Sequence, residues 1–347
     1  MKWDTKVVEQ DLENIAAQSP LPNAPKNYLI TGGTGMFLKY LPKLLLEEVF
    51  SSKVSRHKLF LLVRDLDKAR KEFYAILNND NFHLVPLNRG WQTRITEPID
   101  VLIHGAGSGS PNQVQSSRDD IMTPNVDLTK DLLDFAKYQR LSSFILLSSG
   151  IVYGSNAGVR TVSENDSSKE KHSAILENYQ DAKTLAENIG TQYLLRFGVP
   201  VKIVRPAHCY GPTSDLLRDT RLACYLMKNA LVDKKIHFTG SLLCMRSFVY
   251  ISDAVSALFF IEKFGIPGEA YNLFSSRDFV SVQVFLEELL LKIIDIKISA
   301  QDTLNKREGL YMKPDKLESI GWSPKVKLKE GIERTIQHFS EELGIKI

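Results

Sequence analysis

The sequence of 347 residues has little cysteine, no long block of one charge sign and no apolar run of membrane-spanning length. Its three cysteines, Cys209, Cys224 and Cys244, lack metal-ligand spacing and leave one thiol unpaired in any disulfide scheme, which is typical of a reducing compartment and of core thiols. The 44 basic and 41 acidic residues leave a formal charge of only +3. We therefore expect no metal site and no nucleic-acid or membrane surface, and instead a small-molecule ligand.

The start of the chain lacks the apolar core of a secretory signal, because Asp4, Glu9, Asp11 and Glu13 lie there. We accordingly expect a cytoplasmic protein. Residues 1–25 are predicted to be an N-terminal extension with a short amphipathic helix, and a proline-containing connector follows it. The sequence assigns this extension no role.

Apolar runs separated by helical stretches dominate the rest of the chain, and 43% of all residues are hydrophobic. Strands alternating with helices favour a doubly wound parallel sheet of the Rossmann type, an α/β fold. The predicted strands are residues 28–31, 58–63, 100–104, 143–148 and 201–205, with a weaker one at 82–85.

The alternation ends after Ala207 and returns in residues 246–264, which predicts a second lobe that is not contiguous in sequence. We predict a dinucleotide-binding domain over residues 26–206, to which residues 246–264 return. The second, smaller C-terminal lobe then comprises residues 207–245 and 265–347.

A glycine-rich turn, Gly32-Gly33-Thr34-Gly35, lies where the first strand becomes a helix-like run. Such a turn presents backbone N–H groups to a pyrophosphate, and the helix dipole adds a favourable potential. A purely structural turn is the alternative. The third glycine of the usual spacing is Leu38, and Pro42 would kink the helix unless it falls near the helix start.

Arg64 and Asp65 follow the second strand, where a dinucleotide fold places the residue that contacts the adenosine ribose. An acidic side chain there accepts from the 2′-hydroxyl of NAD, whereas Arg64 can pair with the 2′-phosphate of NADP or stack on adenine. The cofactor is therefore NAD or NADP, with a lean to NADP from Arg64.

A candidate catalytic set comes from two neighbouring motifs. Tyr179 and Lys183 lie four residues apart at the start of a predicted helix, so they share one face, and the ammonium can lower the pKa of the phenol. Of the twelve tyrosines, only Tyr179 has a lysine four residues on. Ser149 directly follows the predicted strand at 143–148 and can hydrogen-bond to the same substrate oxygen. A tuned tyrosine can exchange a proton with a sugar hydroxyl.

The chain resembles an extended short-chain dehydrogenase/reductase of the nucleotide-sugar epimerase and dehydratase family. The resemblance rests on the motifs TGGTGMF, HGAGSGSP, NVDLTKDLLDFA, SSGIVYG, YQDAK, RPAHCYGP, RSFVYISDA, GEAYNL and SIGWSPKVKLKEGIERTI, which extend over nearly everything after residue 26. It implies that the C-terminal lobe binds a nucleoside diphosphate sugar and that the protein is a homodimer packed through helices.

Carried over by position, the resemblance implies roles for individual residues. Ser149, Tyr179 and Lys183 become the catalytic set, and His208 and Arg246 become contacts to the substrate. The residues implied to bind the cofactor are Gly32, Gly35, Met36, Phe37, Arg64, His104, Ala106, Asn125, Tyr179 and Lys183. His208 stands where the family usually has asparagine, and a structural histidine is the alternative there. For Arg246, implied to contact the diphosphate, the alternative is a salt bridge between lobes.

The residues after Ser149 depart from part of the family. Members that dehydrate the sugar resemble one another in an Asp-Glu pair there, and members that decarboxylate a uronic acid keep a glutamate, whereas this chain has Gly150 and Ile151. Neither residue can donate or accept the proton that elimination requires. The sequence therefore favours a nucleotide-sugar epimerase that oxidises C4 transiently.

Two alternatives remain open from sequence. A keto-sugar reductase or nucleotide-sugar dehydrogenase would use the same Ser149, Tyr179 and Lys183 and consume or produce cofactor in each turnover. A non-catalytic dinucleotide-binding protein is the other, since a fold does not fix a function.

Overall fold

The computed structural model describes residues 5–47, 57–107, 117–155, 158–166, 174–212, 216–293, 296–301 and 307–345. Across these ranges, no helix combines the length and the apolar character needed to cross a lipid bilayer.

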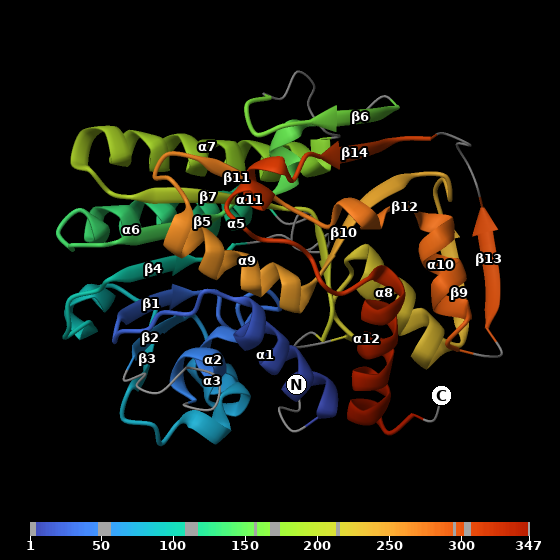
Figure 1. Cartoon of the computed structure of the whole chain (residues 1–347), viewed down its shortest axis with the longest axis horizontal. Helices are drawn as coiled ribbons and strands as arrows, with labels where there is room; N and C mark the ends of the chain where they lie inside the picture. The colour runs from blue at the N-terminus through green and yellow to red at the C-terminus, as the bar shows by residue number, and fades with distance from the viewer. Residues whose placement is uncertain are drawn as a thin grey trace.

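Seven parallel strands form the central sheet in the order β11-β7-β5-β4-β1-β2-β3 (Figure 1). They are β1 (Asn27–Thr31), β2 (Lys58–Val63), β3 (Phe82–Pro86), β4 (Val101–His104), β5 (Ser143–Leu147), β7 (Val201–Pro206) and β11 (Ala270–Leu273). The six predicted strands and the Rossmann-type fold are confirmed. The strand order reverses between β1 and β4, and ligands of such sheets bind at this switch point.

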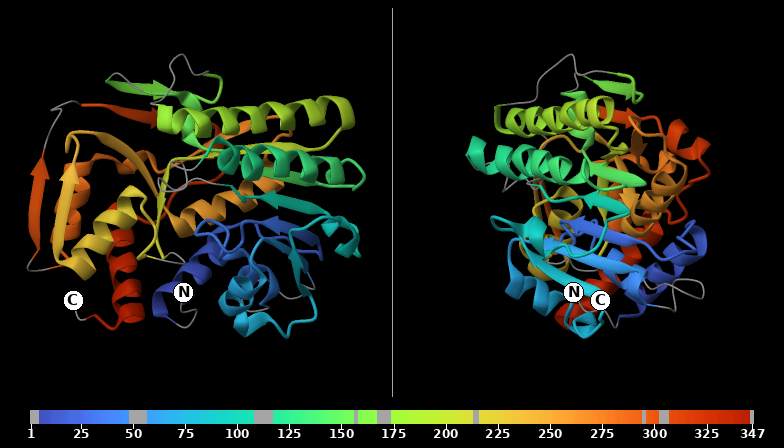
Figure 2. Two further views of the ribbon diagram at one scale, coloured as in Figure 1. Left: turned by 180° about the vertical axis from the view of Figure 1, so that it is seen from behind. Right: turned by 90° about the vertical axis from the view of Figure 1, so that its left-hand side faces the viewer.

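Both faces of the sheet are covered by helices, which explains why its strands are apolar almost throughout. Alternate residues of β1 enter different cores, Tyr28 and Ile30 on one face and Leu29 on the other. The first face packs against α1 (Lys6–Gln18), α2 (Leu41–Leu46) and α9 (Ile251–Phe264). The second packs against α6 (Leu128–Ala136) and α7 (Ala174–Phe197), the green helices that Figure 2 shows on the opposite side of the sheet from orange α9.

The second lobe is built from small sheets and helices beside the carboxyl ends of the central strands (Figure 1). In its three-stranded sheet, β10 pairs with β8 in parallel and with β12 antiparallel. The strands outside the central sheet are β6 (Val159–Val162), β8 (His208–Tyr210), β9 (Lys235–Thr239), β10 (Met245–Tyr250), β12 (Phe279–Ser281), β13 (Lys297–Gln301) and β14 (Gly309–Met312). The remaining α-helices are α3 (Leu66–Glu72), α5 (Arg118–Met122), α8 (Leu222–Lys228), α10 (Val282–Leu290), α11 (Asp315–Ser319) and α12 (Leu328–Leu343).

One predicted lobe boundary needs correction. Residues 270–273 were assigned to the second lobe, but they form β11, the edge strand of the central sheet beside β7. The strand is only four residues long and was not recognised as one. The other boundaries remain predictions.

The amphipathic helix predicted in the N-terminal extension is confirmed as α1. The Thr5 hydroxyl caps it by accepting a hydrogen bond from the N–H of Val8. Its apolar side packs against α9 and α12, while Glu9 and Glu13 face solvent. The exception to this pattern is Asp11, which is completely buried.

Candidate active site at the switch point of the sheet

The glycine turn leaves β1 at the switch point and lies against the end of β4. Gly32 adopts a φ of +77°, and a Cβ there would lie 2.4 Å from the carbonyl carbon of Gly105. The N–H of Gly35 closes the turn by donating to the Gly32 oxygen at 2.9 Å. Only glycine satisfies both the backbone angle and the close approach at position 32.

The turn does not open directly into a helix, contrary to the prediction. Residues 36–40 form turns, and α2 begins only at Leu41, with Pro42 in its first turn, where proline is tolerated. Leu38 explains the delay, because its side chain is buried against Gly105 where the usual third glycine would let a helix pack closely. A six-residue helix that starts this far on adds little dipole to the turn.

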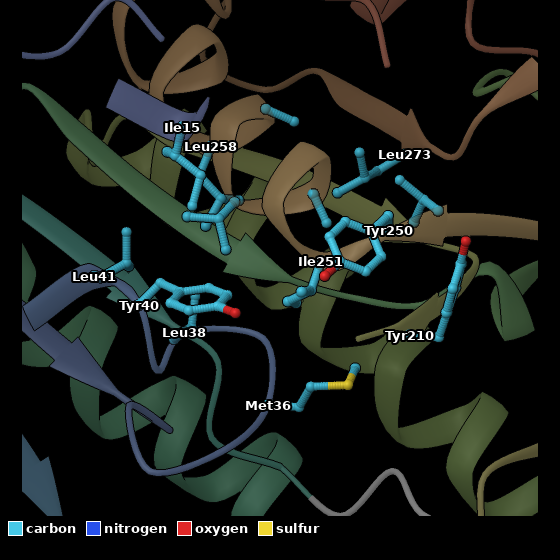
Figure 3. Close-up of a cluster of buried hydrophobic side chains, with 14 of the residues drawn as sticks. Ile15, Met36, Leu38, Tyr40, Leu41, Tyr210, Tyr250, Ile251, Leu258 and Leu273 are labelled. Atoms are coloured by element: carbon cyan, nitrogen blue, oxygen red, sulfur yellow. The ribbon is translucent and has the colours of Figure 1, made fainter. Parts of the chain in front are cut away.

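Met36 and Phe37, predicted near the cofactor, differ in exposure. The Met36 side chain belongs to the buried hydrophobic cluster drawn in Figure 3, so only its backbone is left to face a ligand at the turn. Phe37 is partly buried.

His104 fixes the end of β4 through a chain of hydrogen bonds. Thr129 donates its hydroxyl proton to the Asn125 carbonyl oxygen at 2.6 Å, so it accepts from Nε2 of His104 at 2.9 Å. Nδ1 then accepts from the Thr31 hydroxyl at 2.7 Å, and Thr31 in turn accepts from the N–H of Ala106 at 3.1 Å. Burial and the charge of Lys183 lower the His104 pKa to about 3, which keeps the ring neutral, and the hydrogen bonds select its tautomer.

Asn125 carries an unsatisfied polar atom toward the place where a dinucleotide would bind. Its amide nitrogen donates to the Ile121 oxygen at 2.8 Å, while its buried Oδ1 has no hydrogen-bond partner among the described residues. A Cβ at Gly107 would lie 2.4 Å from that Oδ1 and 3.2 Å from Nζ of Lys183. An amide oxygen and an ammonium beside a glycine fit the hydroxyls and amide of a nicotinamide riboside.

A cavity of about 540 Å³ forms the other end of the candidate dinucleotide site, away from Lys183. Its lining includes Arg64, Asn88, Arg89, Gln92, Ala106 and Asp131. Asp65 is not in the lining, because its carboxylate caps α3 by accepting from the N–H of Lys68 at 2.9 Å. Arg89 was not predicted; it lies in the loop after β3, at the same edge of the sheet as Arg64.

Ser149, Tyr179 and Lys183 are brought together at the carboxyl end of β5. The Ser149 hydroxyl hydrogen-bonds to the Tyr179 phenol, and the Lys183 ammonium lies 5.8 Å from the centre of the Tyr179 ring. Nζ of Lys183 donates to the Leu147 carbonyl oxygen at 2.9 Å. The structure therefore assembles the predicted set from β5 and α7.

The predicted electrostatic effect of Lys183 on Tyr179 is not the one found. Burial raises the Tyr179 pKa above its usual value, and the bond from Ser149 and the charge of Arg221 oppose that rise. Burial also lowers the pKa of Lys183 to about 8, although the carboxylate of Glu187 opposes this. Arg221, which the sequence analysis missed, is thus a cation that acts on the phenol; no motif marked it.

His208 and Arg246 adjoin one another at the start of the second lobe. The His208 ring is accessible to solvent, yet burial of its surroundings and the charge of Arg246 lower its pKa to about 3. Nη1 of Arg246 donates to its own neighbour, the Met245 carbonyl oxygen, at 2.9 Å. A neutral imidazole beside a guanidinium suits a phosphate-bearing ligand.

A buried ion pair supports α7 beneath the candidate catalytic face. Arg205 donates to both carboxylate oxygens of Glu187, at 3.0 and 2.7 Å, and to the Tyr153 hydroxyl at 2.9 Å. Tyr153 donates to Oδ1 of Asn272 at 2.6 Å, and the N–H of Asn272 donates to the Glu164 carboxylate at 2.9 Å. Glu164 is thus part of the structural network around this ion pair.

A side chain added at Gly150 would press on Met312. A Cβ there would lie 2.8 Å from Sδ of Met312, on β14. The N–H of Ile151 donates to the Ser149 hydroxyl oxygen at 3.3 Å. Met312 would therefore have to shift to admit an acidic side chain at position 150.

The sequence between residues 28 and 273 matches the model of the NAD-dependent epimerase/dehydratase family. The chain belongs to this family. A curated human relative, dTDP-D-glucose 4,6-dehydratase, is 28% identical over 341 residues, which is 91% of this chain and 90% of the relative. UDP-glucuronic acid decarboxylase 1 of Xenopus tropicalis is 25% identical over 323 residues, with 92% of this chain and 73% of the relative covered.

Solved structures share the fold of this NAD-dependent family. UDP-glucuronic acid 4-epimerase from Bacillus cereus, in complex with UDP-glucuronic acid and NAD, superposes with a TM-score of 0.75 at 23% identity, covering 91% of this chain and 99% of that one. dTDP-glucose 4,6-dehydratase from Bacillus anthracis, in complex with NAD, gives 0.74 at 22% identity, covering 91% and 97%. The protein is thus an enzyme of the NAD-dependent nucleotide-sugar epimerase, dehydratase and decarboxylase family.

Proposed function

We propose that the protein is an NAD(P)-dependent nucleotide-sugar epimerase that oxidises the sugar transiently at C4. The observation that carries this proposal is the assembly of Ser149, Tyr179 and Lys183 beside Gly150 and Ile151, neither of which can act as an acid or a base. These groups suffice for hydride transfer with one proton shuttle, and they lack the extra acid and base that elimination requires.

In the proposed mechanism, Ser149 and Tyr179 hold the reacting hydroxyl, and Tyr179 takes its proton. The hydrogen bond from Ser149 and the positive charge of Arg221 favour the phenolate that this step needs. The bound dinucleotide would supply the hydride acceptor and donor, held by the Gly32 turn, Asn125 and Lys183. Returning the hydride to the other face of the keto sugar then inverts the carbon.

Several relatives are named as dehydratases or decarboxylases, so the residues after Ser149 decide between these reactions and epimerisation. Gly150 and Ile151 bear no titratable group, and the Met312 thioether lies where a side chain at position 150 would begin. We therefore propose that neither a 6-deoxy-4-keto sugar nor a decarboxylated sugar is the product.

The second candidate is a keto-sugar reductase or nucleotide-sugar dehydrogenase. Arg64 and Arg89 at the 540 Å³ cavity favour it, because two guanidinium groups suit the 2′-phosphate of NADP, the usual reductant of biosynthesis. Asp65 is engaged as a helix cap and does not compete for the ribose hydroxyl. We propose a preference for NADP on these grounds.

We also propose a nucleoside diphosphate sugar as the substrate, with Arg246 and His208 in contact with its diphosphate.

We further propose a homodimer formed through α6 and α7. The outer side of α7 exposes Leu185 and Leu195, and the Leu195 side chain is 73% accessible to solvent. A second copy would bury this apolar surface. Size measurement of the wild type and Leu195→Glu tests the dimer, with the equally exposed Leu291→Glu as control. A cytoplasmic location remains a prediction.

The dinucleotide that stays with the purified protein distinguishes the two candidates. The protein is denatured, and released dinucleotide is identified by mass spectrometry. Stoichiometric oxidised cofactor supports an epimerase with a resident hydride shuttle. Protein that is empty and binds NADPH reversibly supports the reductase.

A further inference from the structure

Asp11 of α1 joins three separate segments of the chain through its buried carboxylate. Oδ2 accepts hydrogen bonds from the hydroxyls of Tyr40 and Tyr250, each at 2.9 Å, and Oδ1 accepts from Nη1 of Arg334 at 2.9 Å. Tyr40 belongs to the segment after the glycine turn, Tyr250 ends β10, and Arg334 lies on α12. Figure 3 shows the Tyr40 and Tyr250 side chains extending toward the space between the turn and α9.

The segment that Tyr40 anchors is the one in which this chain departs from the usual dinucleotide-binding pattern. Leu38 occupies the place of the third glycine, and residues 36–40 are turns without the regular hydrogen bonds of a helix. Such a segment needs other contacts to hold its conformation. Lys39 supplies one by pairing with Glu72 of α3, and Tyr40 supplies another by donating to Asp11.

We propose that Asp11 is a positioning residue for the dinucleotide-binding turn, which it holds through Tyr40 in place of the helix that normally begins there. The N-terminal extension and the leucine at position 38 are then parts of one arrangement. This inference rests on the proposed dinucleotide-dependent function. It gives the extension, which precedes the family-matched region of residues 28–273, a role in cofactor binding.

The same carboxylate also connects the turn to the second lobe. Arg334 and Tyr250 lie on elements of that lobe or its border, and both donate to Asp11. The Thr5 hydroxyl and Nδ1 of His338, 3.1 Å apart, make a second link between the extension and α12. A change at Asp11 therefore loosens the turn and the lobe contact together, whereas a change at Tyr40 loosens the turn alone.

The test compares Asp11→Asn, Tyr40→Phe and their combination with Glu13→Gln, an exposed acid on the same helix. Asparagine has one acceptor oxygen, so at least one of the three donors then faces an amide nitrogen. Kd for NADPH and NADH is measured by nicotinamide fluorescence, and thermal unfolding is followed on the same samples. Asp11→Asn and Tyr40→Phe should each raise Kd by about tenfold, the effect of losing one hydrogen bond to a charged group.

The double variant should bind little worse than Asp11→Asn, because both changes break the same link, and Glu13→Gln should match the wild type. An unchanged Kd in Tyr40→Phe and Asp11→Asn, with only a lower Tm, would overturn the proposal and leave Asp11 a structural anchor. If Asp11→Asn fails to fold, the Kd of Tyr40→Phe decides alone. If the wild type shows no epimerase activity but the variants bind the dinucleotide more weakly than it does, this inference is supported and the proposed function is rejected. If the wild type binds neither dinucleotide, both are rejected.

Discussion

Nζ of Lys183 donates to the Leu147 carbonyl oxygen at 2.9 Å and lies 5.8 Å from the centre of the Tyr179 ring. The ammonium is thereby fixed between the end of β5 and the candidate catalytic tyrosine. A buried ammonium at this place can interact with both the bound dinucleotide and the Tyr179 phenol. Its protonation should therefore control the reaction.

We expect kcat/KM to fall as the pH rises through about 8. Burial lowers the Lys183 pKa to about 8, so the ammonium is present below that pH and is lost above it. A pH profile of kcat/KM measures this. Lys183→Arg, whose charge does not titrate in this range, should lack that descending limb even if its rate is lower. A limb unchanged in Lys183→Arg would assign it to another group.

Arg64→Ala should weaken NADPH binding by about tenfold or more and leave NADH binding within about twofold, because a guanidinium-phosphate contact exists only with the 2′-phosphate. Fluorescence titration of both dinucleotides measures the ratio. Arg70→Ala, on the exposed side of α3, is the matched control. Equal losses for both dinucleotides would show that Arg64 stacks on adenine or holds the loop.

Arg205→Met should lower the free energy of unfolding by about 3–5 kcal/mol, because it leaves the buried carboxylate of Glu187 without its partner. Arg205→Met combined with Glu187→Leu should be more stable than Arg205→Met alone, since the unpaired charge is then removed. Urea unfolding of both variants measures the difference. Glu187→Leu alone is measured as well. If the double variant loses as much free energy of unfolding as the two single variants together, other contacts of Arg205 dominate.

Gly32→Ala should destabilise the protein and abolish dinucleotide binding. Its Cβ would lie 2.4 Å from backbone at Gly105, and its φ of +77° is unfavourable for alanine. Thermal unfolding and NADPH titration measure the two effects. Gly198→Ala, which has a similar φ of +70° and open space around it, separates backbone strain from the steric clash. Similar losses in both variants would reject the role of close packing.

The sequence predicted those parts of the fold and site that follow from local pattern. Continuous apolar runs gave six strands of the central sheet, and the four-residue spacing of Tyr179 and Lys183 put both on one face of α7. The delayed start of α2 escaped prediction, because it depends on Leu38 packing against Gly105, two residues far apart in sequence. β11 was missed because four residues carry too little pattern.

Long-range electrostatics were equally beyond reach from sequence. The upward shift of the Tyr179 pKa arises from burial, and the opposing charge of Arg221 comes from the second lobe. Asp11 looks like a solvent-facing acid in a helix rich in charge, yet it is buried among Tyr40, Tyr250 and Arg334. Only tertiary structure identifies its partners.

The most direct test of the proposed chemistry is turnover of nucleotide sugars by the wild type and Tyr179→Phe. UDP- and dTDP-linked hexoses and uronic acids are incubated with dinucleotide-loaded protein, and the products are identified by NMR while nicotinamide absorbance is followed. We predict a C4 epimer formed without net cofactor consumption, and a rate about 10²–10⁴-fold lower in Tyr179→Phe, as expected for loss of a general acid-base group. A Tyr179→Phe variant with near wild-type turnover, or a wild type whose product is dehydrated or decarboxylated, would contradict the account.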